Sequence, residues 1–195
     1  MDTEERNASG RCPWADGSDA LRTYHDDEWG VPSHDDTHLF ELLLLEGAQA
    51  GLSWSTILAK RENYRRALDG FNPERIALYE ERKLAALLQD PGIVRNRLKV
   101  RAVATNARAF LVTRDEYASF AGYLWAWVGG TPIVNQPRLM TDLPARTDLS
   151  DRVSKDLRKR GFTFVGSTIV YAFLQAVGVV DDHLTTCPAK RHSGA

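Results

Sequence analysis

The residues of this chain best suited to bind a metal ion lie near its two ends. The only two cysteines are Cys12 and Cys187, and each has a histidine nearby, His25 and His183. The spacing is Cys-x12-His, a gap of about 157 residues, then His-x3-Cys. Two thiolates and two imidazoles match the tetrahedral preference of Zn2+ and leave no coordination position open. A zinc site of this kind is structural and joins the ends of one domain.

Two other interpretations of the cysteines stay open on spacing alone: a disulfide, or two unconnected buried thiols. The first ten residues lack the apolar core of a signal peptide. We therefore expect a cytoplasmic protein, and a reducing cytoplasm favours metal over disulfide. The Cys-x2-4-Cys spacing of most zinc sites is absent. A helical turn at residues 183–187 would bring His183 and Cys187 onto one face.

A second group combines one carboxylate with aromatic rings. Glu46 ends the apolar run 42–45, and glutamate is seldom buried unless it is paired or functional. A carboxylate among flat aromatic faces suits a planar cation, which can stack on the rings and donate hydrogen bonds to the carboxylate. The alternative, which composition favours, is that Glu46 turns to solvent and the tryptophans fill the core. The aromatic residues concerned are Trp14, Tyr24, Trp29 and Trp54.

Composition indicates one ordinary globular domain. The chain has 195 residues, of which 43% are hydrophobic and 26% charged, and its formal net charge is -1. The longest apolar stretch, 165–180, is too short and too mixed to span a bilayer. Bulk charge gives no argument for nucleic-acid binding, so such binding needs local basic clusters. Candidates are Lys60, Arg61, Arg65 and Arg66; Arg95, Arg97, Lys99 and Arg101; and Lys155, Arg158, Lys159 and Arg160.

The elements that position these residues are predicted to be helices. Apolar periodicity and capping residues predict helices at about 36–47, 54–68, from 73, and at 82–89, 94–113, 116–127, 150–160 and 164–177. Residues 132–144 contain three prolines and are expected to form a long loop, and alternating strands are not evident. We expect an all-α domain over 11–190, with disordered tails at 1–10 and 191–195.

The segment 84–101 has the pattern of a helical hairpin. A short helix, a Pro91-Gly92 turn and a second, basic helix follow one another. Gly92 lets the backbone approach a phosphate, and the next helix begins with free N–H groups beside Arg95 and Arg97. A helix-hairpin-helix element grips a DNA strand in this way without recognising its bases. The alternative is an ordinary hairpin with a Pro-Gly turn.

Five sequence strings then show a resemblance to a known family. They are RCPW (11–14), YHDDEWGVP (24–32), LEGAQAGLSW (45–54), KRENYR (60–65) and KRGFTFVG (159–166). Together they resemble the bacterial 3-methyladenine DNA glycosylase I family over about residues 11–190. The resemblance implies the all-α fold of the helix-hairpin-helix glycosylases. It also implies one structural zinc ion held by Cys12, His25, His183 and Cys187.

The resemblance further implies an activity and a site. Such an enzyme flips a base methylated at N3 of adenine out of double-stranded alkylated DNA and hydrolyses its glycosidic bond. Free 3-methyladenine and an abasic site remain. Glu46 is the implied catalytic partner of the cationic base, and Leu52 is the implied wedge that fills the gap in the duplex. Trp14, Tyr24, Trp29 and Trp54 are implied to form the base pocket, and Gly92, Arg95 and Arg97 to hold phosphate.

Three functions from different classes are compatible with these residues. The first is the glycosylase, acting as a monomer and without a catalytic aspartate, since Asp115 is expected in an inter-helix loop. The second is a DNA-binding protein that keeps the pocket without turnover. The third is a zinc hydrolase, which four protein ligands disfavour because no site remains for water.

Overall fold

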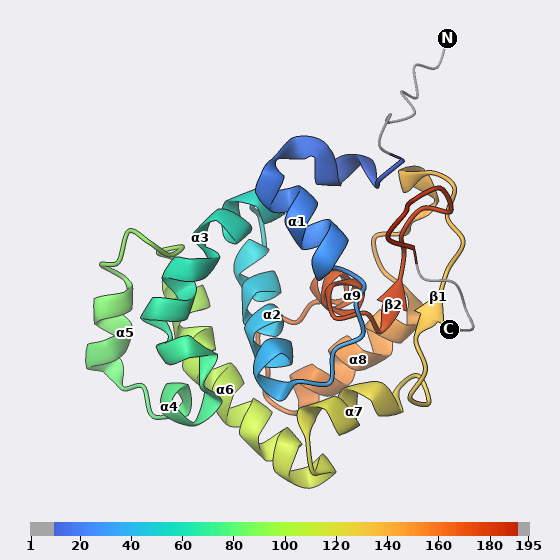
Figure 1. Cartoon of the computed structure of the whole chain (residues 1–195). Helices are drawn as coiled ribbons and strands as arrows, with labels where there is room; N and C mark the ends of the chain where they lie inside the picture. The colour runs from blue at the N-terminus through green and yellow to red at the C-terminus, as the bar shows by residue number, and fades with distance from the viewer. Residues whose placement is uncertain (1–9, 191–195) are drawn as a thin grey trace.

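A computed structural model describes residues 10–190, and Figure 1 shows their arrangement around a central helix. The disordered tails were expected at 1–10 and 191–195, and except for Gly10 these residues lie outside the described part of the chain. The α-helices are α1 (Asp19–Asp27), α2 (Asp36–Gln49), α3 (Trp54–Ala67), α4 (Pro73–Ala77), α5 (Glu81–Leu87), α6 (Arg97–Tyr117), α7 (Phe120–Ala126), α8 (Asp148–Lys159) and α9 (Ser167–Ala176). Three short 3-10 helices are η1 (Pro13–Gly17), η2 (Asp69–Phe71) and η3 (Met140–Asp142).

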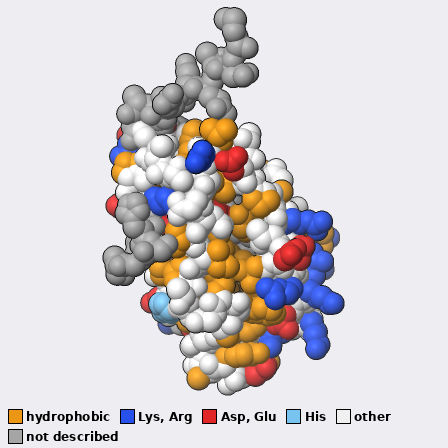
Figure 2. Space-filling view, turned by 90° about the vertical axis from the view of Figure 1, so that its right-hand side faces the viewer, with side chains coloured by type: hydrophobic (Ala, Val, Ile, Leu, Met, Phe, Trp, Pro, Cys, Tyr) orange, Lys and Arg blue, Asp and Glu red, His pale blue; other side chains and the backbone are white. Residues whose placement is uncertain are grey.

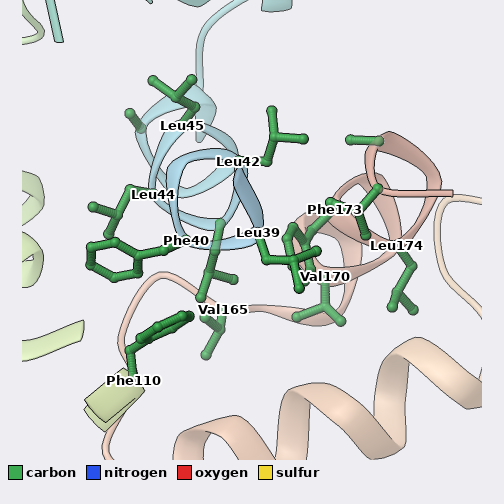
Figure 3. Packing of buried hydrophobic residues seen from close by; sticks show 14 of the residues in the cluster. Leu39, Phe40, Leu42, Leu44, Leu45, Phe110, Val165, Val170, Phe173 and Leu174 are labelled. Carbon is green, nitrogen blue, oxygen red and sulfur yellow. The ribbon is translucent and has the colours of Figure 1, made fainter. Parts of the chain in front are cut away.

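Helix α2 lies at the centre of the fold. Its residues 39–48 are buried without interruption, so this helix has no solvent-facing side over nearly three turns. It packs against α3, α6, α7 and α9. Figure 3 shows Phe40 of α2 facing Phe110 of α6, while Leu39 lies towards Val170 of α9. The leucine run 42–45 is therefore core on both sides of the helix.

Capping residues set the helix boundaries where the sequence predicted them. Asp35, Ser53 and Asn72 each accept a backbone N–H in the first turn of α2, α3 and α4. Asn96 caps α6 in the same manner, so that helix begins at Arg97, three residues after the predicted start. The predicted start at 94 was too early because Val94 and Arg95 are themselves compatible with a helix. The position of the capping residue Asn96 sets the actual start.

The break between α6 and α7 was predicted too early. Helix α6 continues to Tyr117, so Asp115 lies within a helix and not in the expected loop. The chain turns at Ala118, which has a left-handed φ of 64°, and Ser119 then caps α7. Residues 113–116 contain no glycine or proline that would end the helix before that point.

Two further differences concern the C-terminal third. Helix α9 begins at Ser167 and not at 164, because Phe164 has a φ of 54° that no helix accommodates. Strands β1 (Ile133–Val134) and β2 (Val180–Asp181) pair in parallel, although the sequence showed no strand pattern. Both strands are two residues long, too short for an alternating pattern to reveal them. Among the described helices, none combines the length and apolar character needed to cross a membrane.

Gly178 allows the chain to pass from α9 to β2 against the segment that follows α1. Its φ is 72°, and a Cβ added there would lie 2.4 Å from Val31 C and Pro32 N. Both of those atoms are backbone, so a side chain cannot be accommodated by a rotamer change. This contact brings the C-terminal segment beside the N-terminal segment.

We expect Gly178→Ala to destabilise the protein more than Gly130→Ala. Gly130 has a similar φ of 78° but open space around its Cβ position, so it isolates the cost of backbone conformation. That cost is about 1–2 kcal/mol, and overpacking at Gly178 adds about 1–3 kcal/mol. Urea unfolding of both variants measures the difference, and equal losses of stability would contradict the packing argument.

Candidate active site and metal centre

A cavity of about 480 Å³ lies at one end of α2. Helices α1, α2, α3 and α9 contribute to its walls, and the segment from Met140 to Ala145 forms one rim. All of the residues predicted to form a base pocket line this cavity, namely Trp14, Tyr24, Trp29, Glu46 and Trp54. The structure therefore brings together five side chains that come from separate segments of the sequence.

Glu46 is the buried carboxyl group of this cavity. It lies in the last turn of α2 and is 5% exposed. Burial raises the pKa of Glu46 to about 8, because removal from water penalises the charged form. The prediction of a buried glutamate among aromatic rings agrees with this geometry, and the solvent-facing alternative does not. A cation placed in the cavity would favour the ionised carboxylate.

Two hydrogen-bonding groups of the cavity walls are buried without a partner among the described residues. They are the hydroxyl of Tyr24 and the indole Nε1–H of Trp54. Their rings lie 5.1 Å apart between centroids, at an interplanar angle of 46°. Burial raises the pKa of Tyr24 well above its usual value, and the neighbouring Glu46 carboxylate adds to the effect. Unsatisfied buried polar groups are rare in folded proteins, so their convergence on one cavity indicates a ligand that hydrogen-bonds to them.

A second group of side chains can hold a metal ion. Cys12, His25 and Cys187 are buried, and one ligand atom from each lies within 4.8 Å of the others. Both cysteines are free thiols in this structure. Burial raises the pKa of Cys12 to about 12, which the charge of a bound metal ion would reverse.

His183 lies against this group, with its ring centroid 4.9 Å from that of His25. Its Nδ1 is 2.8 Å from a carboxylate oxygen of Asp181, and its buried Nε2 has no hydrogen-bond partner among the described residues. A carboxylate on one imidazole nitrogen and a free second nitrogen is the usual arrangement of a metal-binding histidine. The chemistry of this donor set is therefore that of a metal-binding site. His183 and Cys187 follow β2 in an irregular segment, so the expected helical turn there is wrong.

The aromatic cavity and the Cys/His group share a wall. The ring centroid of Trp29 is 4.6 Å from that of His183, and that of Trp14 is 5.2 Å from that of His25. Trp14 and Trp29 themselves meet edge to face at 5.2 Å. Trp14 and Trp29, which line the cavity, therefore also pack against His25 and His183 of the Cys/His group.

Arg61 is a residue of the site region whose role the sequence did not reveal. The sequence places it in a candidate basic cluster for nucleic-acid binding, yet it is 8% exposed. From α3 it donates to Glu41 of α2 at 2.6 Å and, through two nitrogens, to Glu28 just after α1 at 2.6 and 2.7 Å. Burial alone would raise the pKa of Glu28, but hydrogen bonds involving His38 and Arg61 lower it to about 2.

Arg61 thus joins the three helices that carry Tyr24, Glu46 and Trp54. The sequence did contain a signal for its burial. Arg61 lies four residues after Ile57 and three before Tyr64, and both of those side chains are buried. The prediction followed the charge of Arg61 and not its position on the helix. Its acidic partners, Glu28 and Glu41, could be identified only from the tertiary structure.

The residues predicted to contact DNA lie near one rim of the cavity. Leu52 is 43% exposed in the turn between α2 and α3, and Arg95 and Arg97 are exposed at the start of α6. Lys99 links these two places, because its Nζ donates to the carbonyls of Ala48 at 2.8 Å and Ala50 at 2.6 Å.

Gly92 sits in the predicted hairpin turn between α5 and α6. Its N–H donates to Asp90 Oδ1 at 2.7 Å, and a Cβ there would lie 3.0 Å from Asn63 Cβ. The absence of a side chain thus serves the packing of the hairpin on α3. A phosphate contact through this N–H needs Asp90 to release it.

The fold and site define a mostly helical domain with a buried carboxyl group in an aromatic cavity and a Cys/His group near its two ends. Residues 14–191 match the family model described as methyladenine glycosylase, and the chain belongs to that family. DNA-3-methyladenine glycosylase 1 of Escherichia coli (strain K12) is 46% identical over 177 residues, which cover 91% of this chain and 95% of the relative.

Solved structures show the same relationship. The 3-methyladenine DNA glycosylase I of Staphylococcus aureus superimposes with a TM-score of 0.92 and 37% identity, covering 96% of this chain and 100% of the other. A variant of a 3-methyladenine DNA glycosylase I in complex with 3-methyladenine gives a TM-score of 0.91 and 37% identity, covering 94% and 98%. The predicted family and the mostly helical fold are confirmed.

The raised pKa of Glu46 predicts a specific pH dependence of stability. Between the ordinary pKa of 4.5 and the folded value of about 8, the folded state holds a proton that the unfolded state has lost. Glu46 therefore costs stability as the pH rises through this window, by up to about 5 kcal/mol above pH 8. We expect Glu46→Gln to raise the melting temperature at pH 8.5 relative to wild type and to change it little at pH 5. A difference that is equal at the two pH values would contradict the buried, proton-holding carboxyl group.

Proposed function

We propose that this protein is a DNA-3-methyladenine glycosylase, a hydrolase of N-glycosidic bonds that acts in base excision repair. The observation that carries the proposal is the convergence of Glu46, Tyr24 OH and Trp54 Nε1 on one aromatic cavity. A flipped purine is planar and presents hydrogen-bonding edges, which these groups can satisfy. The named activity of the relative in E. coli and the 3-methyladenine bound in a structural relative support the same function.

The proposed reaction depends on the charge of the damaged base. Methylation at N3 makes the adenine cationic, so the bond between N9 and the sugar C1′ is already weak. When that bond breaks, its electron pair stays with N9, the base leaves as neutral 3-methyladenine, and water adds to C1′ with loss of a proton. Glu46 binds the cationic base as an electrostatic partner and is the catalytic residue in this proposal. Trp54 and Tyr24 bind the base, and Trp14 and Trp29 shape the walls.

The same proposal assigns the contacts with double-stranded DNA. Leu52 enters the gap left by the extruded nucleotide, since an exposed apolar side chain at a turn can act as a wedge. Arg95 and Arg97 bind phosphate, and the turn at Gly92 approaches the backbone. We further propose a single domain over 11–190 that acts as a cytoplasmic monomer.

We expect Glu46→Ala and Trp54→Ala to slow the release of 3-methyladenine from methylated DNA by about 100-fold or more, since each removes a group that contacts the base. Glu80→Ala is a matched control, because Glu80 is exposed and does not line the cavity. Chromatography of the released base under single-turnover conditions measures the rates. If the wild-type protein does not release the base, the glycosylase proposal is wrong, and the alternative of a DNA-binding protein without turnover is favoured. Wild-type rates in both Glu46→Ala and Trp54→Ala would contradict the assignment of these residues to the base-binding site.

We also propose one structural zinc ion held by Cys12, His25, His183 and Cys187. The free Nε2 of His183 and the buried thiols support this ligand set. When bound, the metal supplies a strong link between the two ends of the domain, with no open position for catalysis. The adjoining Trp14 and Trp29 then keep their places in the cavity wall.

Elemental analysis is expected to find one zinc per chain in the wild-type protein and much less than one in Cys12→Ser. Loss of the ion removes several kcal/mol of folding free energy, which lowers the melting temperature of a domain of this size by about 10 °C or more. His34→Ala serves as a control, because His34 stacks on Trp125 outside the ligand group. A zinc content near zero in the wild-type protein would rule the site out.

A further inference from the structure

A polar cavity of about 530 Å³ adjoins the aromatic cavity. Thr168 lines both of them. Ala145 belongs to the rim of the aromatic cavity, and the next residue, Arg146, lines the polar one. The polar cavity therefore lies directly beyond the rim formed by residues 140–145.

The charged residues of this polar cavity are mostly basic. Its lining includes Arg146, Lys155 and Arg158, which are all exposed, and one acidic residue, Asp151. With three basic residues and one acidic residue, the lining carries a net positive charge, whereas the whole chain has a formal charge of -1. We call Arg146, Lys155 and Arg158 the basic cavity residues.

Two of these residues have no ionic partner in the described part of the chain. Arg146 Nη1 lies 3.5 Å from Asp151 Oδ1, but no described carboxylate lies within 4.0 Å of the charged groups of Lys155 and Arg158. Two other members of the basic clusters, Arg160 and Arg61, are already engaged by carboxylates. Arg160 binds Glu116 at 2.7 Å and Asp156 at 2.5 Å, and Arg61 is buried against Glu28 and Glu41. Lys155 and Arg158 can thus bind an external anion.

The polar cavity, which we also call the basic cavity because of these residues, lies close to the aromatic cavity. This position indicates which anion the basic cavity can bind. On one rim of the aromatic cavity, the turn with Leu52 lies beside the start of α6, which begins at Arg97, two residues after Arg95. The basic cavity lies beyond the rim formed by 140–145. Figure 2 shows one face of the molecule on which Lys and Arg side chains gather along the right-hand edge, beside hydrophobic side chains. Basic side chains therefore adjoin the aromatic cavity at two places, and a strand whose nucleotide occupies this cavity can contact both.

We propose that Arg146, Lys155 and Arg158 bind a phosphate of the DNA strand that carries the flipped nucleotide. This inference rests on the proposed glycosylase function and adds a second anchoring surface to the hairpin. Phosphate contacts fix the register of a protein on a duplex without recognising sequence. Anchoring one strand on both sides of the extruded nucleotide holds the distorted backbone while the base is in the cavity.

The test is the binding of a duplex that contains a stable abasic-site analogue, measured by fluorescence anisotropy from 50 to 200 mM salt. The variant is Lys155→Gln combined with Arg158→Gln. The matched control is Arg75→Gln combined with Arg82→Gln, which changes charge by the same amount at exposed positions on α4 and α5. Figure 1 places α5 at the left-hand edge of the molecule and α8, the helix that carries Lys155 and Arg158, to the right of its centre.

We expect the Lys155/Arg158 variant to bind about 5- to 10-fold more weakly at about 0.15 M salt. The slope of log K against log salt should become shallower by about 0.9 for each phosphate that the variant no longer binds. The control should stay within about 2-fold of wild type with an unchanged slope. Equally weakened binding in the two double variants, or an unchanged slope in the first, would overturn the proposal.

Two further measurements separate this inference from the proposed function. Binding of free 3-methyladenine, followed by tryptophan fluorescence, should be unchanged in the Lys155/Arg158 variant because neither residue lines the aromatic cavity. If the wild-type protein releases no base, the proposed glycosylase function is wrong. The salt dependence of DNA binding still tests the role of the basic cavity in that case. Circular dichroism checks the fold, and Lys155→Gln alone replaces the double variant if needed.

Discussion

The burial of helix α2 is the constraint on which the rest of the structure depends. Two glutamates, Glu41 and Glu46, are buried with it, and their surroundings differ. Glu41 accepts hydrogen bonds from Arg61 at 2.6 Å and from Arg65 at 2.9 Å, so its charge is compensated. Glu46, five residues later, lies in the aromatic cavity, where desolvation raises its pKa to about 8. A carboxyl group kept at this cost is suited to a ligand that brings its own positive charge.

The ion pairs of Arg61 give the cavity its geometry. One guanidinium group connects Glu28, Glu41 and the helix α3 that carries Arg61 itself. Three of the residues that line the cavity with polar groups, Tyr24, Glu46 and Trp54, come from α1, α2 and α3, which this guanidinium connects. Breaking a buried pair leaves an uncompensated charge, which is strongly unfavourable. The arrangement of the site is therefore tied to the stability of the fold.

The two ends of the domain form the other half of the site. The close approach of Gly178 to Val31 and Pro32 brings the segment after β2 beside the segment after α1. His183 can then lie against His25 and Trp29, and Cys187 against His25 at 3.5 Å. Because Trp14 and Trp29 contact these histidines, the aromatic cavity and the Cys/His group form one connected assembly.

The sequence by itself determined the family, the helical class, the starts of α2, α3 and α4, and five of the residues that line the cavity. Helix starts were predictable because Asp35, Ser53 and Asn72 act locally on their own first turns. Tertiary structure alone decided the burial of Arg61, the orientation of His183 by Asp181, the pairing of β1 with β2 and the nearness of the basic cavity to the aromatic one. Most of these features depend on residues far apart in the chain, whose contacts arise only when the helices pack around α2.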